Sequence, residues 1–455
     1  MLLFEIETEI PSPSTSGDGL FELLASRATS AVPAEFRPMR FAVVDSTDGR
    51  WRCEIGGASV TGGNSPDGES ELFRFIPRPI ERAREFNTVL LVPTGVGASL
   101  GGHAGDACPA VRVLAAACDR LITHPNAVNA SDINEMPTNG LFVEGSIITR
   151  LLMGTAGLQE VRANRLLVIV DKHPDDQFTD ASINSVNAAR ACAGIDCGEI
   201  VVLNEPLVSR ARYTNTGCAA GRVEDCQPLL DLLRARRGQY DAVAITSVVD
   251  VPPGFHREYF EHDRDMINPW GGIEALLTHA VSSYENVPSA HSPMMENSDV
   301  AYMRVPRIDP RKAAEAVSMT FLHCILKGLH KSPRVITDSI ALREPGILNS
   351  SDVSCVVIPD GCLGLPTIAA CLQGIPTIAV VENTNLMRND LSQLPWQPGK
   401  FFRVANYWEA AGVMLALKAG VDPLSIRRPL APISVTESQE STGQSNLGER
   451  QSSRL

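Results

Sequence analysis

The sequence has few aromatic side chains and no excess of positive charge. Phe, Tyr and Trp make up 5% of its 455 residues, so the stacking surfaces that hold single-stranded nucleic acid are largely missing. Asp and Glu number 53 against 40 Lys and Arg, and the formal net charge of −13 repels phosphate backbones and anionic lipid. We therefore expect a small-molecule substrate, and neither nucleic acid nor a membrane as a partner.

Patterns typical of export and membrane insertion are also missing. No apolar run reaches the length that spans a bilayer, and the three glutamates within the first ten residues are atypical of a secretion signal. The eleven cysteines are scattered without a C-x-x-C pattern, which favours free thiols in a reducing compartment. Together these features predict a cytoplasmic protein.

What the sequence has instead is an alternation of short β-branched runs and helical stretches. Unbroken apolar strands separated by helices are typical of parallel sheets covered on both faces. We therefore predict an α/β fold with doubly wound, mostly parallel sheets, compatible with two Rossmann-like lobes, and ligands at the carboxyl ends of strands. The predicted strands are residues 89–92, 120–123, 166–170, 200–203, 242–247, 335–337, 353–358 and 377–381.

The length of the chain favours more than one core. An Asp48-Gly49 turn between two apolar runs predicts a hairpin near the N-terminus, within a small α+β appendage. The last residues are rich in Ser, Gln, Glu, Thr and Gly and have little to bury. The predicted divisions are 1–84 (appendage), 85–250 (first α/β unit, with a glycine-rich loop), 251–431 (second α/β unit) and 432–455 (disordered tail).

The most informative segment is the glycine-rich loop over residues 93–106, which follows one predicted strand and precedes a predicted helix. Unpaired backbone amides beside a helix N-terminus form a receptor for an anion, and glycine allows close approach because it has no Cβ. We expect the loop to bind the carboxylate or phosphate of a substrate. The expected binding residues here are Thr94, Gly95, Gly97, Ser99, Gly101 and Gly102.

Further polar segments are expected at the ends of other strands, the edge of the sheet where ligands bind. One follows the strand at 120–123, one combines Trp with a glycine pair at a helix start, and one follows the strand at 353–358. Each also has a plain interpretation as a turn or helix cap. The expected substrate-binding residues in them are Asn126, Asn129, Asn268, Trp270, Gly271, Asp360 and Gly361.

Four residues are expected to carry the chemistry. His103 or His291, the latter in a predicted loop, would move a proton, and Asp106 would orient a histidine or the substrate. Cys108 would act as a nucleophile if a neighbouring charge lowered the pKa of its thiol, and is otherwise a small buried residue.

Two glutamates have open roles. Glu144, in a predicted helix over residues 139–153, lies either at a site or on an exposed face. Glu274, at the start of the helix after the Trp-Gly-Gly segment, can be a stabilising helix carboxylate.

A charged run over residues 256–265 contains residue types that bind divalent metals. On a helix, Glu258, His262 and Asp265 would share one face. The interleaved arginines favour a solvated face, so we expect no metal site, and the sequence does not specify a cofactor.

Four segments together are similar to a bacterial and plastid-lineage family that is known only as a domain of unknown function. They are residues 93–98 (PTGVGA), 123–126 (THPN), 268–272 (NPWGG) and 290–293 (AHSP). The resemblance spans most of residues 85–385. The resemblance implies that the four segments belong together, but it assigns no reaction to the chain.

The function that these observations favour is group transfer or lyase chemistry on an anionic substrate, in a cleft lined by glycine-rich loops. A cofactor-independent isomerase or racemase that uses Cys108 and Cys362 is an alternative, as is a protein that binds a small ligand without turnover. The sequence leaves open whether the chain is an enzyme and whether it forms a homo-oligomer.

Overall fold

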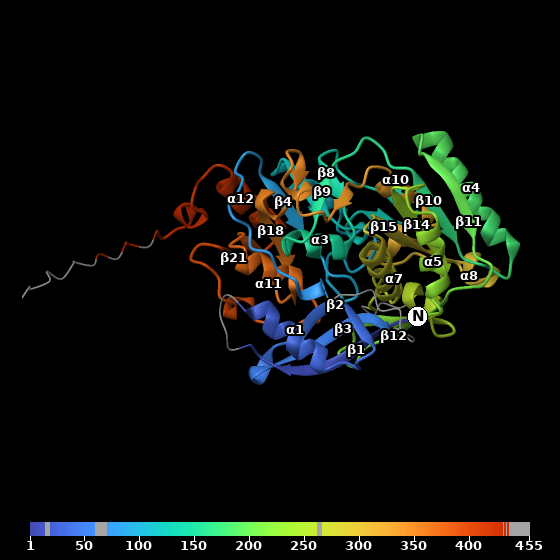
Figure 1. Cartoon of the computed structure of the whole chain (residues 1–455), viewed down its shortest axis with the longest axis horizontal. Coiled ribbons are helices and arrows are strands. Elements are labelled where there is room, and N and C mark those ends of the chain that lie inside the picture. The colour runs from blue at the N-terminus through green and yellow to red at the C-terminus, as the bar shows by residue number, and fades with distance from the viewer. Residues whose placement is uncertain (14–18, 60–70, 262–265, 431, 434, 436–455) are drawn as a thin grey trace, which may run out of the picture.

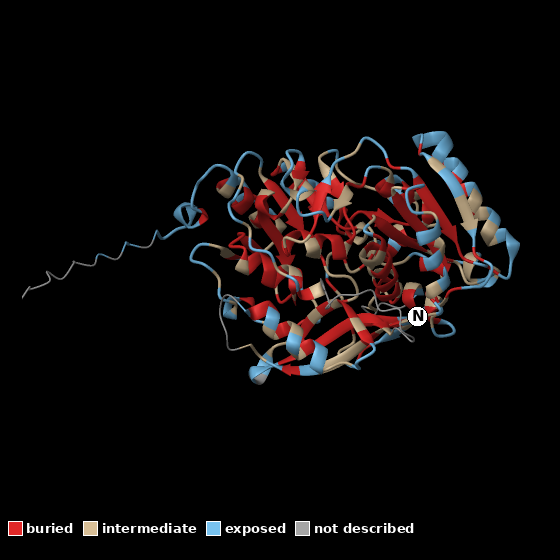
Figure 2. Ribbon diagram, viewed as in Figure 1, coloured by how far each residue is buried: buried red, intermediate tan, exposed pale blue. Residues whose placement is uncertain are grey.

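A computed structural model describes residues 1–13, 19–59, 71–261, 266–430, 432, 433 and 435. The fold is mixed α/β, with two parallel sheets and one antiparallel sheet built mainly from the N-terminal part (Figure 1). The inner strands of both parallel sheets are buried, as Figure 2 shows, whereas the edge strand over residues 197–202 is half-buried or exposed. The predicted α/β class with parallel sheets is therefore confirmed.

The first parallel sheet has six strands in the order β21-β20-β18-β4-β5-β8. Alternate residues of its strands face opposite layers, so Val357 packs with α2 and α12, whereas Val356 packs with α3 and α11. The strands are β4 (Asn87–Leu90), β5 (Arg120–Thr123), β8 (Gly140–Phe142), β18 (Val353–Pro359), β20 (Thr377–Val380) and β21 (Phe401–Val404). The helices are α2 (Cys108–Ala116), α3 (Gly145–Leu152), α11 (Leu365–Leu372) and α12 (Tyr407–Lys418).

The second parallel sheet has four strands in the order β11-β10-β14-β15. Helices again cover both faces, α4 and α10 on one and α5 and α7 on the other. The strands are β10 (Leu166–Val170), β11 (Cys197–Val202), β14 (Ala242–Val248) and β15 (Ser289–Met294). The helices are α4 (Asp176–Ala193), α5 (Gln227–Ala235), α7 (Trp270–Glu285) and α10 (Leu322–His330).

The antiparallel sheet, in the order β12-β13-β1-β3-β2-β19, joins distant parts of the chain. Leu3 of β1 lies opposite Val223 of β13, and Val43 of β2 lies opposite Leu363 of β19. Helix α1 (Leu20–Ser30) packs in the same apolar cluster as β2 and β3. The strands are β1 (Leu2–Pro11), β2 (Phe36–Asp45), β3 (Arg50–Ser59), β12 (Val208–Tyr213), β13 (Ala219–Glu224) and β19 (Leu363–Gly364).

Short elements complete the described fold. A three-stranded sheet combines β9 with β16 and β17, and a two-stranded ribbon pairs β6 with β7. Their bounds are β6 (Asn129–Ala130), β7 (Ile133–Asn134), β9 (Gly157–Gln159), β16 (Arg334–Ile336) and β17 (Ile347–Leu348). The short helices are α6 (Phe255–Glu261), α8 (Ser298–Ala301), α9 (Pro310–Ala313) and the 3-10 turn η4 (Ala314–Ala316).

All eight predicted strands are present, with shifts of a few residues at their ends. Two local predictions are wrong. The predicted helix over 139–153 begins only at Gly145, because residues 140–142 form strand β8, and His291 lies in buried strand β15 rather than in a loop. His262, Asp265 and almost all of the predicted tail lie outside the described residues.

The sheets do not follow the predicted division at residue 250. Residues 85–250 and 251–431 each supply strands to both parallel sheets. Strands β4 and β18, which have similar strand-to-glycine sequences, are neighbours in one sheet, with Val89 opposite Val356.

Candidate functional site

Helix α7 separates two cavities. Gly272, Ala275 and His279 line one of them, whereas Trp270 and Glu274 line the other. Residues three or four apart share a face of a helix, so each cavity is met by one face of α7. Both cavities lie beside carboxyl ends of parallel strands, the edge that the sequence predicts for ligand binding.

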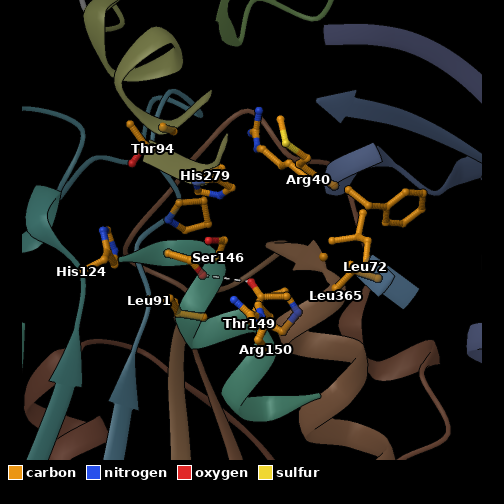
Figure 3. A pocket seen from close by; sticks show the side chains of 18 of the residues that line it. Arg40, Leu72, Leu91, Thr94, His124, Ser146, Thr149, Arg150, His279 and Leu365 are labelled. Carbon is orange, nitrogen blue, oxygen red and sulfur yellow. Dashed lines mark hydrogen bonds between the residues drawn. The ribbon is translucent and has the colours of Figure 1, made fainter. Parts of the chain in front are cut away.

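The first cavity, which we call the arginine cavity, is defined by Arg37, Arg40, Arg74 and Arg150 and has a volume of about 660 Å³. Figure 3 shows Arg40 from β2, Arg150 from α3 and His279 from α7 around the same space. Among the described residues that line the cavity there is no aspartate or glutamate. This composition favours a negatively charged ligand.

The four arginines have different surroundings. Arg40 is ion-paired with the buried carboxylate of Glu5, which offsets its charge. Arg150 donates to an uncharged group, the amide oxygen of Asn286 (2.7 Å). Arg74 is exposed, and Arg37 is half-buried.

Helix α11 begins at the edge of the arginine cavity. Its N-cap is Gly364, which has no side chain to occupy the first amides, and Leu365, Pro366 and Thr367 line the cavity. The first amides of a helix carry partial positive charge. The N-terminus of α11 therefore adds to the positive character that the arginines create.

A buried carboxylate–imidazole pair lies at the wall of the arginine cavity. The Glu144 Oε1 atom is 2.7 Å from Nδ1 of His279, and Glu144 Oε2 accepts the amide of Ser146 (2.9 Å) at the start of α3. Burial raises the pKa of Glu144, but the interactions with His279 and Ser146 outweigh it and hold this pKa below its usual value. The two groups form a close ionic contact, although the ring N–H is not aligned for a hydrogen bond.

A second histidine of the same wall is held as an acceptor. The amide of Val92 donates to Nε2 of His124 (3.1 Å), and burial lowers the pKa of His124 to about 4. His124 is therefore neutral near pH 7, with its proton on Nδ1.

Several amides of the glycine-rich loop bind acceptors of the protein itself. Gly101 donates to the carboxylate of Asp106 (2.8 Å), Ala104 to that of Glu315 (2.6 Å), and Leu100 to the side-chain oxygen of Asn383 (2.9 Å). Burial raises the pKa of Asp106 to about 7. Two carboxyl groups of the same chain, those of Asp106 and Glu315, therefore occupy amides of this loop.

The second cavity, which we call the carboxyl cavity, is defined by Glu274 of α7 and Glu315 of η4 and has a volume of about 280 Å³. It lies between the segment after β5 and the end of β15. Five predicted site residues line it together: Asn126, Asn129, Asn268, Trp270 and His291.

The four predicted catalytic residues do not converge on one cavity. His103 is buried, with Nδ1 2.8 Å from the hydroxyl of Tyr259, and Asp106 closes the glycine-rich loop. The Cys108 thiol donates to the carbonyl of Ala127 (3.8 Å), and burial raises its pKa to about 11.

The remaining predicted binding residues have varied positions. Thr94 lines the arginine cavity. Gly95, Gly97 and Gly101 have φ values of +79°, +64° and +90°, which glycine adopts without strain. The Ser99 hydroxyl donates to the side-chain oxygen of Asn383, and Asp360 is ion-paired with Arg403. The three glycines lie close to other parts of the chain: Gly102 to Ala98, Gly271 to Thr94 and Gly361 to Met387.

Sequence reasoning missed most of the arginine cavity. The arginines lie more than a hundred residues apart at the extremes, so no local pattern joins them. The position of His279 could have been found from helical spacing. Ala275, His279 and Ser283 follow the Trp-Gly-Gly segment at intervals of four residues and therefore share one face of the helix.

The comparisons with known proteins agree with the resemblance of the four segments. A sequence family described as a protein of unknown function (DUF3326) matches residues 87–427. The chain belongs to this family. An uncharacterised lipoprotein of Synechococcus sp. (strain ATCC 27144 / PCC 6301 / SAUG 1402/1) is 31% identical over 349 residues, which cover 75% of this chain and 94% of that protein. No solved structure matches the chain.

Neither a metal site nor a membrane span is found in the described ranges of this family member. No group of three His, Cys, Asp or Glu side chains within them is placed to hold a metal ion. None of the helices found there is both long and apolar enough to cross a membrane.

Proposed function

We propose that the protein is a small-molecule enzyme that binds a phosphate- or carboxylate-bearing substrate in the arginine cavity. The observation that carries the proposal is the Glu144–His279 pair, 2.7 Å apart, at the wall of a cavity lined by four arginines. Guanidinium groups are suited to carboxylates and phosphates because they donate in a planar fork. A carboxylate-oriented histidine beside an anion site is suited to moving a proton.

In the proposed chemistry each group has a separate role. Arg74, Arg150 and the first amides of α11 hold the anionic group of the substrate. His279 takes a proton from the substrate at Nε2, because Nδ1 faces Glu144, which is a positioning residue. Such proton removal serves both group transfer and elimination, the two reaction classes that the sequence favours.

The two parallel sheets are, in this proposal, the two lobes expected from the sequence. Each presents the carboxyl ends of its strands to a cavity, and α7 lies between the cavities. The isomerase alternative has less support. Cys362 lines the arginine cavity and Cys108 is not among the lining residues described for it, while burial raises the pKa of both thiols.

Binding can be tested by thermal unfolding with inorganic phosphate, pyrophosphate and citrate. We expect each anion to raise the Tm of the wild-type protein. At a hundredfold excess over its Kd, an anion should increase the free energy of unfolding by about 2.7 kcal/mol. Arg74→Gln and Arg150→Gln should weaken this effect. Arg343→Gln is the matched control, since it removes one exposed arginine outside the cavity. Equal effects of the anions on all four proteins would contradict the proposal.

Turnover needs a separate experiment. Wild-type protein and His279→Gln are incubated with a mixture of phosphorylated and carboxylated metabolites, and the mixture is followed by mass spectrometry. We expect a substrate to be consumed by the wild-type protein alone. Binding without consumption would favour the non-catalytic ligand-binding alternative.

A further inference from the structure

The carboxyl cavity has a composition opposite to that of the arginine cavity. Its two acidic side chains, Glu274 and Glu315, lie on the far side of α7 from the arginines, and no lysine or arginine is among the described residues that line it. Two carboxyl groups that share one small space repel one another when both are ionised. The cavity therefore favours a ligand that brings positive charge.

The two carboxyl groups are not equally satisfied. Glu315 accepts the amide of Ala104 (2.6 Å) and the side-chain amide of Asn268 (3.4 Å). For Glu274, no hydrogen bond or ion pair reaches the carboxyl group from the described part of the chain. Burial, together with the charge of Glu315, raises the pKa of Glu274 to about 8. Of the two carboxyl groups, Glu274 is therefore the one without a partner among the described residues.

Independent evidence for a ligand comes from strand β15. His291 and Ser292 line the cavity and are 5% and 1% exposed. Nε2 of His291 is 2.8 Å from the hydroxyl of Ser247, but Nδ1 of His291 and the Ser292 hydroxyl have no hydrogen-bond partner among the residues that the structure describes. Buried polar atoms in native proteins are nearly always paired, so these two residues of the cavity wall retain hydrogen-bonding capacity that is available to a ligand.

The rest of the cavity wall is aromatic and sulfur-rich. Trp270 and Phe260 line it together with Met294 and Met303. The His256 ring lies 5.0 Å from the Trp270 ring, which supports the indole in place. Aromatic faces attract cations. The thioether groups of methionine pack well against the alkyl groups of an organic cation, because sulfur is polarisable.

We propose that the carboxyl cavity is a binding site for a small organic cation of the alkylammonium class. The ammonium group would lie against Glu274, and the alkyl groups against Trp270 and the methionines. An anion would face two carboxyl groups there, and an uncharged apolar ligand would leave Glu274 unpaired. The proposal is independent of the arginine cavity, so either can fail alone.

The charge balance around Glu274 supports a cation. His256 and His291 are neutral near pH 7, because burial lowers their pKa values to about 4 and about 3. Lys312, a buried cation of α9, donates to the carbonyl of Tyr259 (2.7 Å). Besides Glu274, the titratable groups among the described residues that line the cavity are Glu315, His256, His291 and Cys324. Asp106 and Tyr259 interact with Glu315, and Asp132 interacts with Cys324.

The test is calorimetric titration of the full chain with choline and with 3,3-dimethylbutan-1-ol, its uncharged isostere. We expect choline to bind at least about tenfold more tightly, because only choline has a charge for Glu274 and Trp270. Glu274→Gln and Trp270→Leu should each weaken choline binding by about tenfold or more. Glu258→Gln is the control, since it removes an exposed carboxylate of α6 outside the cavity.

Three results would overturn the proposal: no choline binding, equal affinity for the two compounds, or unchanged affinity in Glu274→Gln. If Trp270→Leu does not fold, as judged by circular dichroism, Glu274→Gln still decides the outcome. The heat of choline binding at pH 7, measured in buffers of different ionisation enthalpy, also tests the site: choline should displace the proton of the Glu274 carboxyl group to the buffer, and a heat that does not depend on the buffer would contradict this.

Discussion

Two glutamates near α7 show how the immediate surroundings decide the charge of a buried carboxyl group. Glu144 has His279 at 2.7 Å and two amides, and its pKa lies below the usual value. Glu274 has neither, and its pKa is raised to about 8. The same residue type is therefore an anion on one side of the helix and a neutral acid on the other at pH 7.

Glu274→Gln should change how stability depends on pH. The carboxyl group of Glu274 is protonated in the folded protein up to about pH 8, whereas in the unfolded chain it ionises near 4.5. Its contribution to stability is therefore present below pH 4.5 and is lost as the pH rises through 8. Urea unfolding should show the variant equal to wild type at pH 4.5 and more stable by at least about 1 kcal/mol at pH 8.5. With Glu258→Gln as the control, a constant difference across this range would contradict the argument.

Glu144→Gln should have the opposite dependence. The pKa of Glu144 is depressed in the folded protein, so its contribution is present above pH 4.5 and is lost as the pH falls through its folded value. We expect the variant to lose about 3 kcal/mol at pH 7 and much less near pH 3. A double-mutant cycle with His279→Gln measures the coupling, and additive losses would show that the pair does not interact.

At the scale of elements, the position of α7 depends on a glycine. A Cβ on Gly272 would lie 2.8 Å from the backbone of Ala219 and Ala220 in β13, so α7 packs on that strand only because the side chain is absent. Gly272→Ala should force the helix away and cost about 1 to 3 kcal/mol. Gly412→Ala is the matched control, because open space surrounds Gly412 in α12. It should stabilise the protein by about 0.5 to 1 kcal/mol. If thermal unfolding shows that Gly272→Ala is more stable than Gly412→Ala, this account of the packing of α7 is wrong.

The elements themselves were largely predictable, because buried parallel strands form continuous apolar runs. The failures have physical causes. Residues 140–142 are a short edge strand next to a helix, and three residues are too few to show a period of two. His291 was expected in a loop because its neighbours are Ser and Pro, but β15 lies at the edge of its sheet, where Pro293 is tolerated.

The whole molecule depends on pairings between distant segments. The family match begins at residue 87, yet strands β1 and β2 lie before it, and β2 supplies Arg37 and Arg40 to the arginine cavity. A chain that lacks residues 1–84 would leave β13 without β1 and β19 without β2. We expect it to lose cooperative urea unfolding, followed by circular dichroism. A chain that ends at residue 435 should keep the wild-type midpoint, since the composition of the removed tail predicts disorder. An unchanged midpoint in the chain without 1–84 would contradict the role of these pairings.

The candidate site was predictable only in part at this scale. The loops after β5 and around Trp270 and His291 converge on the carboxyl cavity, as expected for carboxyl ends of parallel strands. The arginine cavity brings together β2, α3 and α7, and only the pairing of sheets makes them neighbours. A pattern within any one segment could not reveal it.

The occupied amides of the glycine-rich loop have a consequence for any dissolved anion. Asp106 and Glu315 are tethered to the same chain as Gly101 and Ala104, so each competes at an effective concentration of about millimolar or more. A free phosphate or carboxylate could displace them only by exceeding that local supply or by gaining further contacts elsewhere. These amides of Gly101 and Ala104 are therefore already occupied by carboxyl groups of the protein itself.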